Sequence, residues 1–235
     1  MAAALLETKN VDVAYQAKQV VFKASLEVQE GEFVSLIGHN GAGKTTLLKT
    51  ICGFLPLLGG DILYNGRSIA RRSTEENVRD GIVFVHQEKS LFPNLTVLEN
   101  LKIAAYALDL QAELEQRLAT VYSLFPILKE RGHQLAKTLS GGQQKQVAIG
   151  MAILVRPKVL LLDEPTLGLS PNLVHELGRV LREIKEMGTS ILLVEQNVGM
   201  AINLAERVFV MKTGQIILAA SKQEMLARDD LWDLF

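Results

Sequence analysis

A glycine-rich segment with one lysine and one threonine has the spacing of a phosphate-binding loop. Residues 38–45 read Gly-His-Asn-Gly-Ala-Gly-Lys-Thr and fit the pattern G-x-x-x-x-G-K-[ST]. The segment lies between an apolar strand-like run and a helical pattern, so its backbone amides and the helix N-terminus can surround phosphate oxygens. Lys44 would reach the β- and γ-phosphates of a nucleotide, and the Thr45 hydroxyl would coordinate Mg²⁺. The predicted nucleotide-binding residues are Gly38, His39, Asn40, Gly41, Ala42, Gly43, Lys44, Thr45 and Thr46.

Two acidic residues follow a second apolar run further along the chain. Val159–Leu162 reads Val-Leu-Leu-Leu, and Asp163 and Glu164 come directly after it. A buried strand that ends in acidic residues can place a carboxylate beside the metal of a bound nucleotide. We expect Asp163 to hold Mg²⁺, directly or through water, and Glu164 to polarise the attacking water. An acidic pair is a weak signal alone, and the phosphate-binding loop strengthens it.

A second glycine-rich turn precedes another helical pattern. Residues 139–143 read Leu-Ser-Gly-Gly-Gln. A serine followed by two glycines at a helix start can form a nest for an anion. The same residues also fit a plain serine N-cap with flexible glycines after it. The physical pattern leaves both interpretations open for Ser140, Gly141, Gly142 and Gln143.

The composition disfavours several classes of protein. The 235 residues carry 25 Lys and Arg against 26 Asp and Glu, a net charge of −1, so we expect no nucleic-acid partner held by bulk electrostatics. The longest apolar run, residues 147–155, contains a glycine and falls short of the roughly 20 residues needed to span a membrane. The first residues lack a positively charged region, so we expect no signal peptide and a cytoplasmic protein. The four histidines lack metal-ligand spacing, and the single cysteine cannot form an intramolecular disulfide.

Periodicity predicts an α/β fold around these segments. Strand-like runs dominate the first third, residues from about Thr96 to Leu139 are mainly helical, and the last third alternates strands and helices. Apolar runs such as Val159–Leu162 suit parallel strands that are buried on both faces. We expect a P-loop NTPase core with a mainly parallel sheet, an antiparallel N-terminal β part and an inserted helical subdomain. The charged segment Arg67–Arg79 is expected to be a solvated face. The expected strands are Ser25–Val28, Glu32–Ile37, Asp61–Tyr64, Ile82–Val85, Val159–Leu162, Ile191–Val194, Val208–Met211 and Ile216–Leu218, and the expected helices are Lys44–Cys52, Gln143–Val155 and one from Pro171.

The pentapeptide at residues 139–143 resembles the signature of ATP-binding-cassette (ABC) ATPases, and the resemblance extends over almost the whole chain. Tyr15 stands where the family has an adenine-stacking aromatic, Gln87 stands at its Q-loop, and residues 166–171 look like its D-loop. Tyr15 also fits a plain core aromatic, and Gln87 also fits an exposed amide at a strand end. The resemblance implies a single ABC ATPase domain, with a core of about residues 1–95 and 157–235 and a helical signature subdomain of about residues 96–156.

The resemblance also implies ligands, partners and residue roles. In this family two subunits pair head to tail, and ATP lies between the phosphate-binding loop of one and the signature of the other. ATP and Mg²⁺ are then the ligands, and the second ATPase subunit is a paralogue or a second copy of this chain. Permease subunits would contact residues 87–95, with a substrate-binding protein acting indirectly, and the chain would lie peripherally on the inner face of the cell membrane. The implied roles are catalysis for Glu164, Gln87 and Gln196, metal binding for Thr45, Gln87 and Asp163, and contact with the partner's ATP for Ser140, Gly141, Gly142 and Gln143.

Within the family, the sequence is more similar to the ATP-binding subunits of importers for branched-chain amino acids or urea. Residues 194–197 read Val-Glu-Gln-Asn, the D-loop reads Leu-Gly-Leu-Ser-Pro, and only a short segment follows the last expected strand. We therefore expect an ATPase that powers amino-acid import. A urea or amide importer and a non-transport ABC ATPase are alternatives. A P-loop switch protein is a further alternative, which the signature disfavours.

Two positions depart from the family pattern. Gln196 stands where most members have a histidine that senses the γ-phosphate, and Ser170 stands where the D-loop commonly has an aspartate. A glutamine amide donates a hydrogen bond but carries no charge at neutral pH. Ser170 also fits an N-cap for the helix that begins at Pro171. We expect slower hydrolysis at this ATP site as a result.

Overall fold

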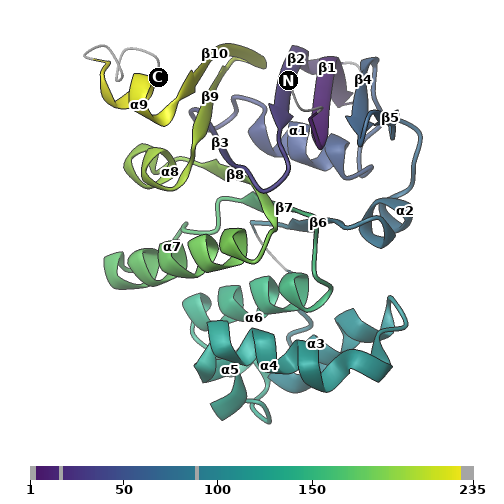
Figure 1. Ribbon diagram of the computed structural model, residues 1–235, viewed down its shortest axis with the longest axis vertical. Helices are drawn as coiled ribbons and strands as arrows, with labels where there is room; N and C mark the ends of the chain where they lie inside the picture. The colour runs from purple at the N-terminus through teal and green to yellow at the C-terminus, as the bar shows by residue number, and fades with distance from the viewer. Residues whose placement is uncertain (1–3, 16–17, 88–89, 229–235) are drawn as a thin grey trace.

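The computed structural model of the protein describes residues 4–15, 18–87 and 90–228, whose strands form two sheets (Figure 1). The first sheet is antiparallel and has the strand order β2-β1-β4-β5, and the second has the order β10-β9-β3-β8-β7-β6. The strands are β1 (Leu6–Tyr15), β2 (Lys18–Val28), β3 (Phe33–Ile37), β4 (Gly59–Tyr64), β5 (Arg67–Ser68), β6 (Ile82–Val85), β7 (Val159–Asp163), β8 (Ser190–Glu195), β9 (Arg207–Lys212) and β10 (Gln215–Ser221).

The second sheet is mainly parallel and brings three chain segments to one edge. Strands β9, β3, β8, β7 and β6 run parallel to their neighbours, and β10 runs antiparallel to β9. The carboxyl ends of β3, β7 and β8 therefore lie along the same edge, which is where open α/β sheets bind ligands. The glycine-rich loop follows β3, Asp163 ends β7, and Gln196 follows β8.

The packing of strand β7 explains why its sequence is apolar at successive positions. Val159 and Leu161 pack in a cluster with the antiparallel sheet and helix α1 (Lys44–Ile51). Leu160 and Leu162 pack in the opposite cluster, together with the inserted helices. Side chains alternate between the two faces of a strand, so a strand covered on both faces needs apolar residues throughout.

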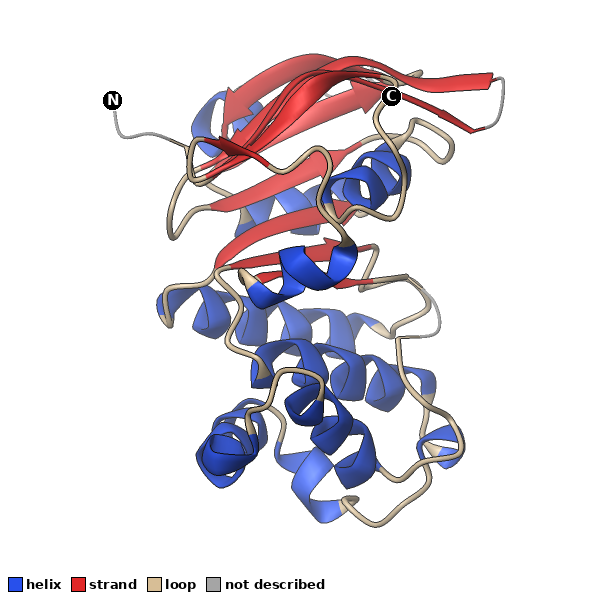
Figure 2. Ribbon diagram, turned by 90° about the vertical axis from the view of Figure 1, so that its right-hand side faces the viewer, coloured by secondary structure: helices blue, strands red, loops and turns tan. Residues whose placement is uncertain are grey.

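The inserted helices lie between β6 and β7 in the chain and gather at the end of the molecule remote from the antiparallel sheet (Figures 1 and 2). Thr96 and Glu99 form a capping box at the start of the first of them, with each side chain accepting from the other residue's amide. These helices are α3 (Val97–Tyr106), α4 (Leu114–Leu124), α5 (Pro126–Glu130) and α6 (Gly141–Leu154). The remaining helices are α2 (Thr74–Arg79), α7 (Pro171–Glu186), α8 (Val198–Leu204) and α9 (Lys222–Leu226).

The α/β fold class is confirmed, and three local expectations need correction. The segment Arg67–Arg79 is not only a solvated charged face, because it contains β5 and helix α2. A capping box between Ser73 and Glu76 forms the start of α2. Helix α6 begins two residues before the expected Gln143, because the Ser140 hydroxyl caps it. Ser170 occupies the N-cap position of α7, but its side chain makes no capping hydrogen bond.

Among the helices of the described residues, none combines the length and the apolar character that crossing a bilayer requires.

Candidate nucleotide-binding and catalytic site

The glycine-rich loop is closely fitted to the end of strand β9. A Cβ atom on Gly38 would lie 2.2 Å from the carbonyl oxygen of Met211, so only glycine fits there. Gly43 precedes α1 with a φ angle of +105°, a conformation that favours glycine. No side chain caps α1. The amides at the start of the helix are therefore available to an anion such as a phosphate group.

The Lys44 side chain turns back onto the loop and is almost fully buried, with 4% of its surface exposed. Its Nζ donates to the carbonyl oxygens of Gly38 and His39 at 2.7 and 3.1 Å. The same atom lies 3.5 Å from Oε1 of Glu164. Burial lowers the pKa of Lys44, while the nearby Glu164 carboxylate opposes that shift. The lysine and the acidic pair thus meet in one cluster, as the sequence predicts.

Thr45 and Asp163 form a direct contact that suits a magnesium ion. The Thr45 hydroxyl donates to Oδ1 of Asp163 at 3.0 Å. Asp163 is buried, and among the described residues its Oδ2 has no hydrogen-bond partner. Burial raises the pKa of Asp163, so a cation beside it would restore its charged form. The described residues contain no group of three or more His, Cys, Asp or Glu that would enclose a metal alone. An ion held by few protein oxygens together with substrate phosphates is typical of Mg²⁺.

Glu164 lies at the centre of a hydrogen-bonded network. Its backbone has a φ angle of +45°, and its amide donates to the carbonyl oxygen of Val194 at 2.9 Å. The Gln196 Nε2 atom donates to Oε2 of Glu164 and to Oδ1 of Asn40, both at 2.6 Å. With Lys44 near Oε1, each carboxylate oxygen of Glu164 therefore has a donor beside it. Gln196 bridges the glycine-rich loop and the candidate base through a single amide group.

Glu195 is a positioning residue that the sequence analysis missed. It is buried, and its Oε1 accepts from the backbone and hydroxyl of Thr166 at 3.0 and 2.7 Å. Its Oε2 accepts from the amides of Gln196 and Asn197 at 3.2 and 3.4 Å. Burial raises the pKa of Glu195, while these hydrogen bonds favour its charged form. Glu195 therefore fixes the segment after β8 to the D-loop. An acidic residue at the end of an apolar strand is the sequence signal for it.

A cavity of about 170 Å³ opens at this edge of the sheet, and most of the predicted nucleotide-binding residues line it. Lys44 lines the cavity, and its Nζ donates to the carbonyl oxygens of Gly38 and His39. Asp163 adjoins it through Thr45, and Gln196 adjoins it through Glu164. The residues that line the cavity are Val20, Asn40, Gly41, Ala42, Gly43, Lys44, Thr45, Thr46, Gln87 and Glu164.

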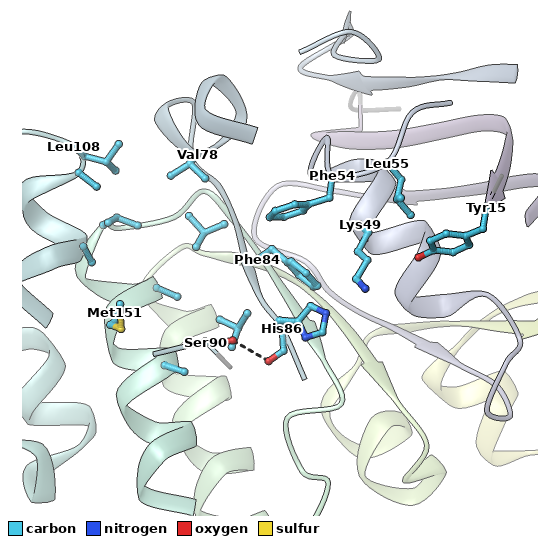
Figure 3. A pocket seen from close by; sticks show the side chains of 17 residues that line it. Tyr15, Lys49, Phe54, Leu55, Val78, Phe84, His86, Ser90, Leu108 and Met151 are labelled. Atoms are coloured by element: carbon cyan, nitrogen blue, oxygen red, sulfur yellow. Dashed lines mark hydrogen bonds between the residues drawn. The ribbon is translucent and has the colours of Figure 1, made fainter. Parts of the chain in front are cut away.

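Tyr15 lies outside this cavity, at a neighbouring and more apolar one. The second cavity has a volume of about 660 Å³, and Tyr15 lines it together with Lys49 and Phe54 (Figure 3). The interpretation of Tyr15 as a core aromatic is wrong, because 42% of its surface is exposed whereas Val11 and Val13 are fully buried. Stacking on adenine stays a prediction.

The signature turn is not brought to the nucleotide cavity of its own chain. None of Ser140, Gly141, Gly142 and Gln143 is among the described residues that line that cavity. The Ser140 hydroxyl accepts from the Gln143 amide at 3.3 Å, and the Gln143 side chain accepts from the Ser140 amide at 3.1 Å. Ser140 and Gly141 are exposed. The plain N-cap interpretation is therefore confirmed as geometry, and the exposed face remains available for a partner.

Comparisons with known proteins agree with this geometry. Residues 21–167 match the ABC transporter family. The chain is 37% identical over 231 residues to the high-affinity branched-chain amino acid transport ATP-binding protein BraG of Pseudomonas aeruginosa, across 98% of this chain and 99% of that protein. It is 34% identical to the lipopolysaccharide export system ATP-binding protein LptB of Escherichia coli, across 95% of this chain and 93% of that protein.

A solved structure extends the similarity to the fold. It is described as the dimeric structure of a post-hydrolysis state of an ATP-binding cassette bound to ADP and Pi. It matches this protein with a TM-score of 0.83 at 26% identity, across 92% of this chain and 98% of that one. The chain therefore belongs to the ABC transporter family. It is an ATPase of that family, which binds ATP and hydrolyses it to power transport.

Proposed function

We propose that this chain is the ATPase subunit of an importer for branched-chain amino acids. The proposal is supported by the 37% identity with BraG over nearly the full length of both proteins. The Val-Glu-Gln-Asn segment and the Leu-Gly-Leu-Ser-Pro D-loop support the same subfamily. The similarity to LptB, a protein named for lipopolysaccharide export, favours export of a lipid-linked substrate as the second candidate.

The network around Glu164 carries the catalytic part of the proposal. Glu164 accepts the proton of the attacking water, and Gln196 holds the carboxylate toward the glycine-rich loop. Lys44 exchanges its contacts with loop carbonyls for contacts with the β- and γ-phosphates, and Tyr15 stacks on the adenine. Thr45, Asp163 and Gln87 would hold Mg²⁺. When bound, the metal supplies positive charge that offsets the charge of the phosphates.

A second ATPase subunit completes the site in this proposal. The exposed Ser140 and Gly141 of one subunit face the γ-phosphate held by the other. The signature turn and the nucleotide cavity are separate on this chain, which supports a head-to-tail pair. The second subunit is a copy of this chain or a paralogue.

The part of the 660 Å³ cavity that Phe54, Phe84 and Met151 line is the proposed contact for the membrane subunits. It lies beside the segment that begins at Gln87, where Phe54, Phe84 and Met151 give it an apolar lining (Figure 3). Phe54 is 57% exposed, so part of this surface lacks a cover within the described chain. Permease contact here would place the protein on the inner face of the cell membrane. Residues 88–89 of the predicted 87–95 contact lie outside the described residues.

Reconstitution with branched-chain amino-acid permease subunits tests the proposal. The complex is placed in vesicles with its substrate-binding protein, and ATP-dependent accumulation of radiolabelled leucine is compared with that of urea. We expect accumulation of leucine, and its loss in the Lys44→Ala variant, which lacks the phosphate-binding ammonium. Accumulation of urea alone would overturn the amino-acid assignment. Release of lipopolysaccharide without any uptake would support the export candidate instead.

A further inference from the structure

Lys145 connects the helix that begins at the signature turn with the segment that carries Gln87. Lys145 lies in the second turn of α6, and its Nζ donates a 2.7 Å hydrogen bond to the backbone carbonyl oxygen of Gln87. The two residues are 58 positions apart in the sequence. Because the donor is an ammonium group, the bond is charge-assisted and stronger than one between neutral groups. Lys145 is half-buried, so water competes with this bond less than at an exposed lysine.

The backbone around Gln87 is held at two successive carbonyl groups. The Ser90 hydroxyl donates to the carbonyl oxygen of His86 at 3.0 Å (Figure 3), and Lys145 donates to the next one. Gln87 lines the nucleotide cavity together with Lys44, and Lys145 does not. The Gln87 backbone therefore gives Lys145 a route by which it can act on the nucleotide cavity.

The start of α6 is fixed on another side by α7 and the D-loop. The Gln146 Nε2 atom donates to Oε1 of Glu176 on α7 at 3.4 Å. A Cβ atom on Gly142 would lie 2.7 Å from Leu173 and 3.4 Å from Leu169, so the signature turn packs directly on these residues. A helix of 14 residues moves largely as one body, so the Lys145 contact ties the position of Gln87 to the direction of the signature turn.

We infer that Lys145 is a positioning residue for ATP hydrolysis, which holds the Gln87 backbone so that its side chain faces the nucleotide cavity and links that position to the signature helix. The inference rests on the proposed role of Gln87 at the metal. It adds a residue that lies outside the nucleotide cavity and reaches the reaction through a main-chain carbonyl.

A double-mutant cycle tests this role by binding as well as by rate. The Glu164→Gln chain serves as the background, and electron paramagnetic resonance measures Mn²⁺ binding in the presence of ATP. Lys145→Met, Lys145→Arg, Gln87→Ala and the Lys145→Met/Gln87→Ala pair are compared there, and kcat and KM for ATP are measured in chains that retain Glu164. Lys129→Met is the matched control, because Lys129 is an exposed lysine of α5.

We expect Lys145→Met to weaken Mn²⁺ binding and lower kcat by about 10-fold, the range of a lost hydrogen bond to a charged group. Lys145→Arg keeps a cationic donor and should stay within about 2-fold of the parent. Residues that act through one another are non-additive, so adding Lys145→Met to Gln87→Ala should change binding by less than about 2-fold. A Lys145→Met chain that behaves like Lys129→Met would overturn the inference.

The cycle also separates this inference from the proposed role of Gln87. In one outcome, Gln87→Ala weakens Mn²⁺ binding while Lys145→Met still has its full effect in the Gln87→Ala background. That result would support the metal role of Gln87 and overturn the positioning role of Lys145. If Gln87→Ala binds Mn²⁺ like the parent, the proposed metal role of Gln87 fails and the inference fails with it. Thermal unfolding of every variant checks folding, and Lys145→Gln replaces Lys145→Met if that chain does not fold.

Discussion

Two glycine-rich turns at helix N-termini differ in how their amides are satisfied. Gly43 precedes α1 with no side-chain cap, so the amides there can donate to a phosphate. Ser140 precedes α6 within a reciprocal capping box with Gln143, so the amides of these two residues already have acceptors within the turn. The first turn is suited to bind a ligand within the chain. The second is stable alone and offers an exposed surface to a partner.

The glycines of the two turns also differ in how closely the rest of the chain packs around them. A Cβ atom on Gly38 would collide with the backbone of Met211 at 2.2 Å, whereas one on Gly141 would meet nothing within 4 Å. The geometry of the nucleotide loop is therefore fixed by contacts inside the chain. Within the described structure nothing restricts Gly141, so a requirement for glycine there would come from the assembled pair.

Charge separates the two regions as well. Three buried carboxylates, those of Asp163, Glu164 and Glu195, lie near the buried ammonium of Lys44. Burial raises the pKa of Asp163 and Glu195 and lowers the pKa of Lys44, so the folded protein holds these charges at a free-energy cost. The signature turn contains no charged residue between Leu139 and Gln144. The nucleotide region therefore carries a cost of buried charge that the signature region does not.

The largest expected effect comes from removing the charge of Glu164. Glu164→Gln keeps the shape of the side chain but cannot accept a proton, so ATP turnover should fall by about 1,000-fold. ATP binding should stay within a few-fold of the parent, because Lys44 and the loop are unchanged. Steady-state phosphate release and equilibrium binding of ATP measure the two quantities.

The control for that variant is Glu130→Gln, which removes an exposed carboxylate at the end of α5 and should leave turnover unchanged. Turnover of Glu164→Gln near the parent rate would show that another group is the base. The difference between the nucleotide loop and the signature turn would then concern only how each turn binds phosphate, and not catalysis.

Substitution of the two adjacent signature glycines, Gly141 and Gly142, should give the next largest effects. Gly141→Ala should weaken ATP-dependent pairing of Glu164→Gln chains by about 10-fold, or about 1.4 kcal/mol, because its methyl group lies on the exposed face. The free energy of unfolding of the monomer should change by less than about 0.5 kcal/mol. Gly142→Ala should instead destabilise the monomer by about 1 kcal/mol, because its methyl group meets Leu173.

Sedimentation with and without ATP measures the pairing, and chemical denaturation measures monomer stability. Pairing of Gly141→Ala chains as tight as in the parent would contradict the view that this face meets a partner. If the functional partner is a paralogue, both variants are assayed with that subunit added.

Asp163→Asn tests the cost of buried charge in the nucleotide region. The asparagine keeps an acceptor for the Thr45 hydroxyl, so the free energy of unfolding near neutral pH should rise by about 1 kcal/mol as a buried charge is lost. The raised pKa of Asp163 means that the wild-type chain loses stability as pH rises through and above the ordinary value of 3.8. The gain should therefore vanish at acidic pH, where both side chains are neutral. Denaturation across pH checks the trend, and an equal gain at every pH would refute it.

Prediction from the sequence was most successful where a motif defines its own local geometry. The spacing of Lys44 and Thr45 determines a loop and a helix start, and the contact of Thr45 with Asp163 then follows from parallel strands ending at one edge. Glu195 was missed because its role depends on Thr166, which lies 29 residues away. Lys145 was missed for the same reason, since nothing near it in sequence indicates a contact with Gln87.

Helix α2 shows a different limit of sequence analysis. Its charged residues predict a solvated face, and the spacing of Ser73 and Glu76 is the local signal for the helix start that this interpretation leaves unused. The apolar strands of the parallel sheet were predicted closely, with β6 correct at both ends, because burial on both faces leaves little choice of residue. Short polar helices on a surface have no comparable constraint.

Gln196 should give the smallest effect, because it acts on Glu164 and is not itself the base. Gln196→Ala removes the donor to both Glu164 and Asn40, while Lys44 still lies near the carboxylate. We expect kcat to fall by about 5-fold, within the range of a lost hydrogen bond to a charged group. Gln196→Asn keeps the amide on a shorter side chain and tests whether reach matters.

Gln196→His distinguishes an adapted glutamine from a weakened site. Beside the carboxylates of Glu164 and Glu195, and with Lys44 opposing them, an imidazole would titrate in the range of about pH 6 to 8. The parent amide does not titrate, so the histidine variant should add a pH dependence to kcat that the parent lacks. Its protonated form donates to Glu164 and adds positive charge near the γ-phosphate, so kcat should rise as pH falls through this range. A pH–rate profile of the histidine variant parallel to that of the parent would show that residue 196 does not act on the chemical step. The contacts of Gln196 with Asn40 and Glu164 would then serve only to hold the loop.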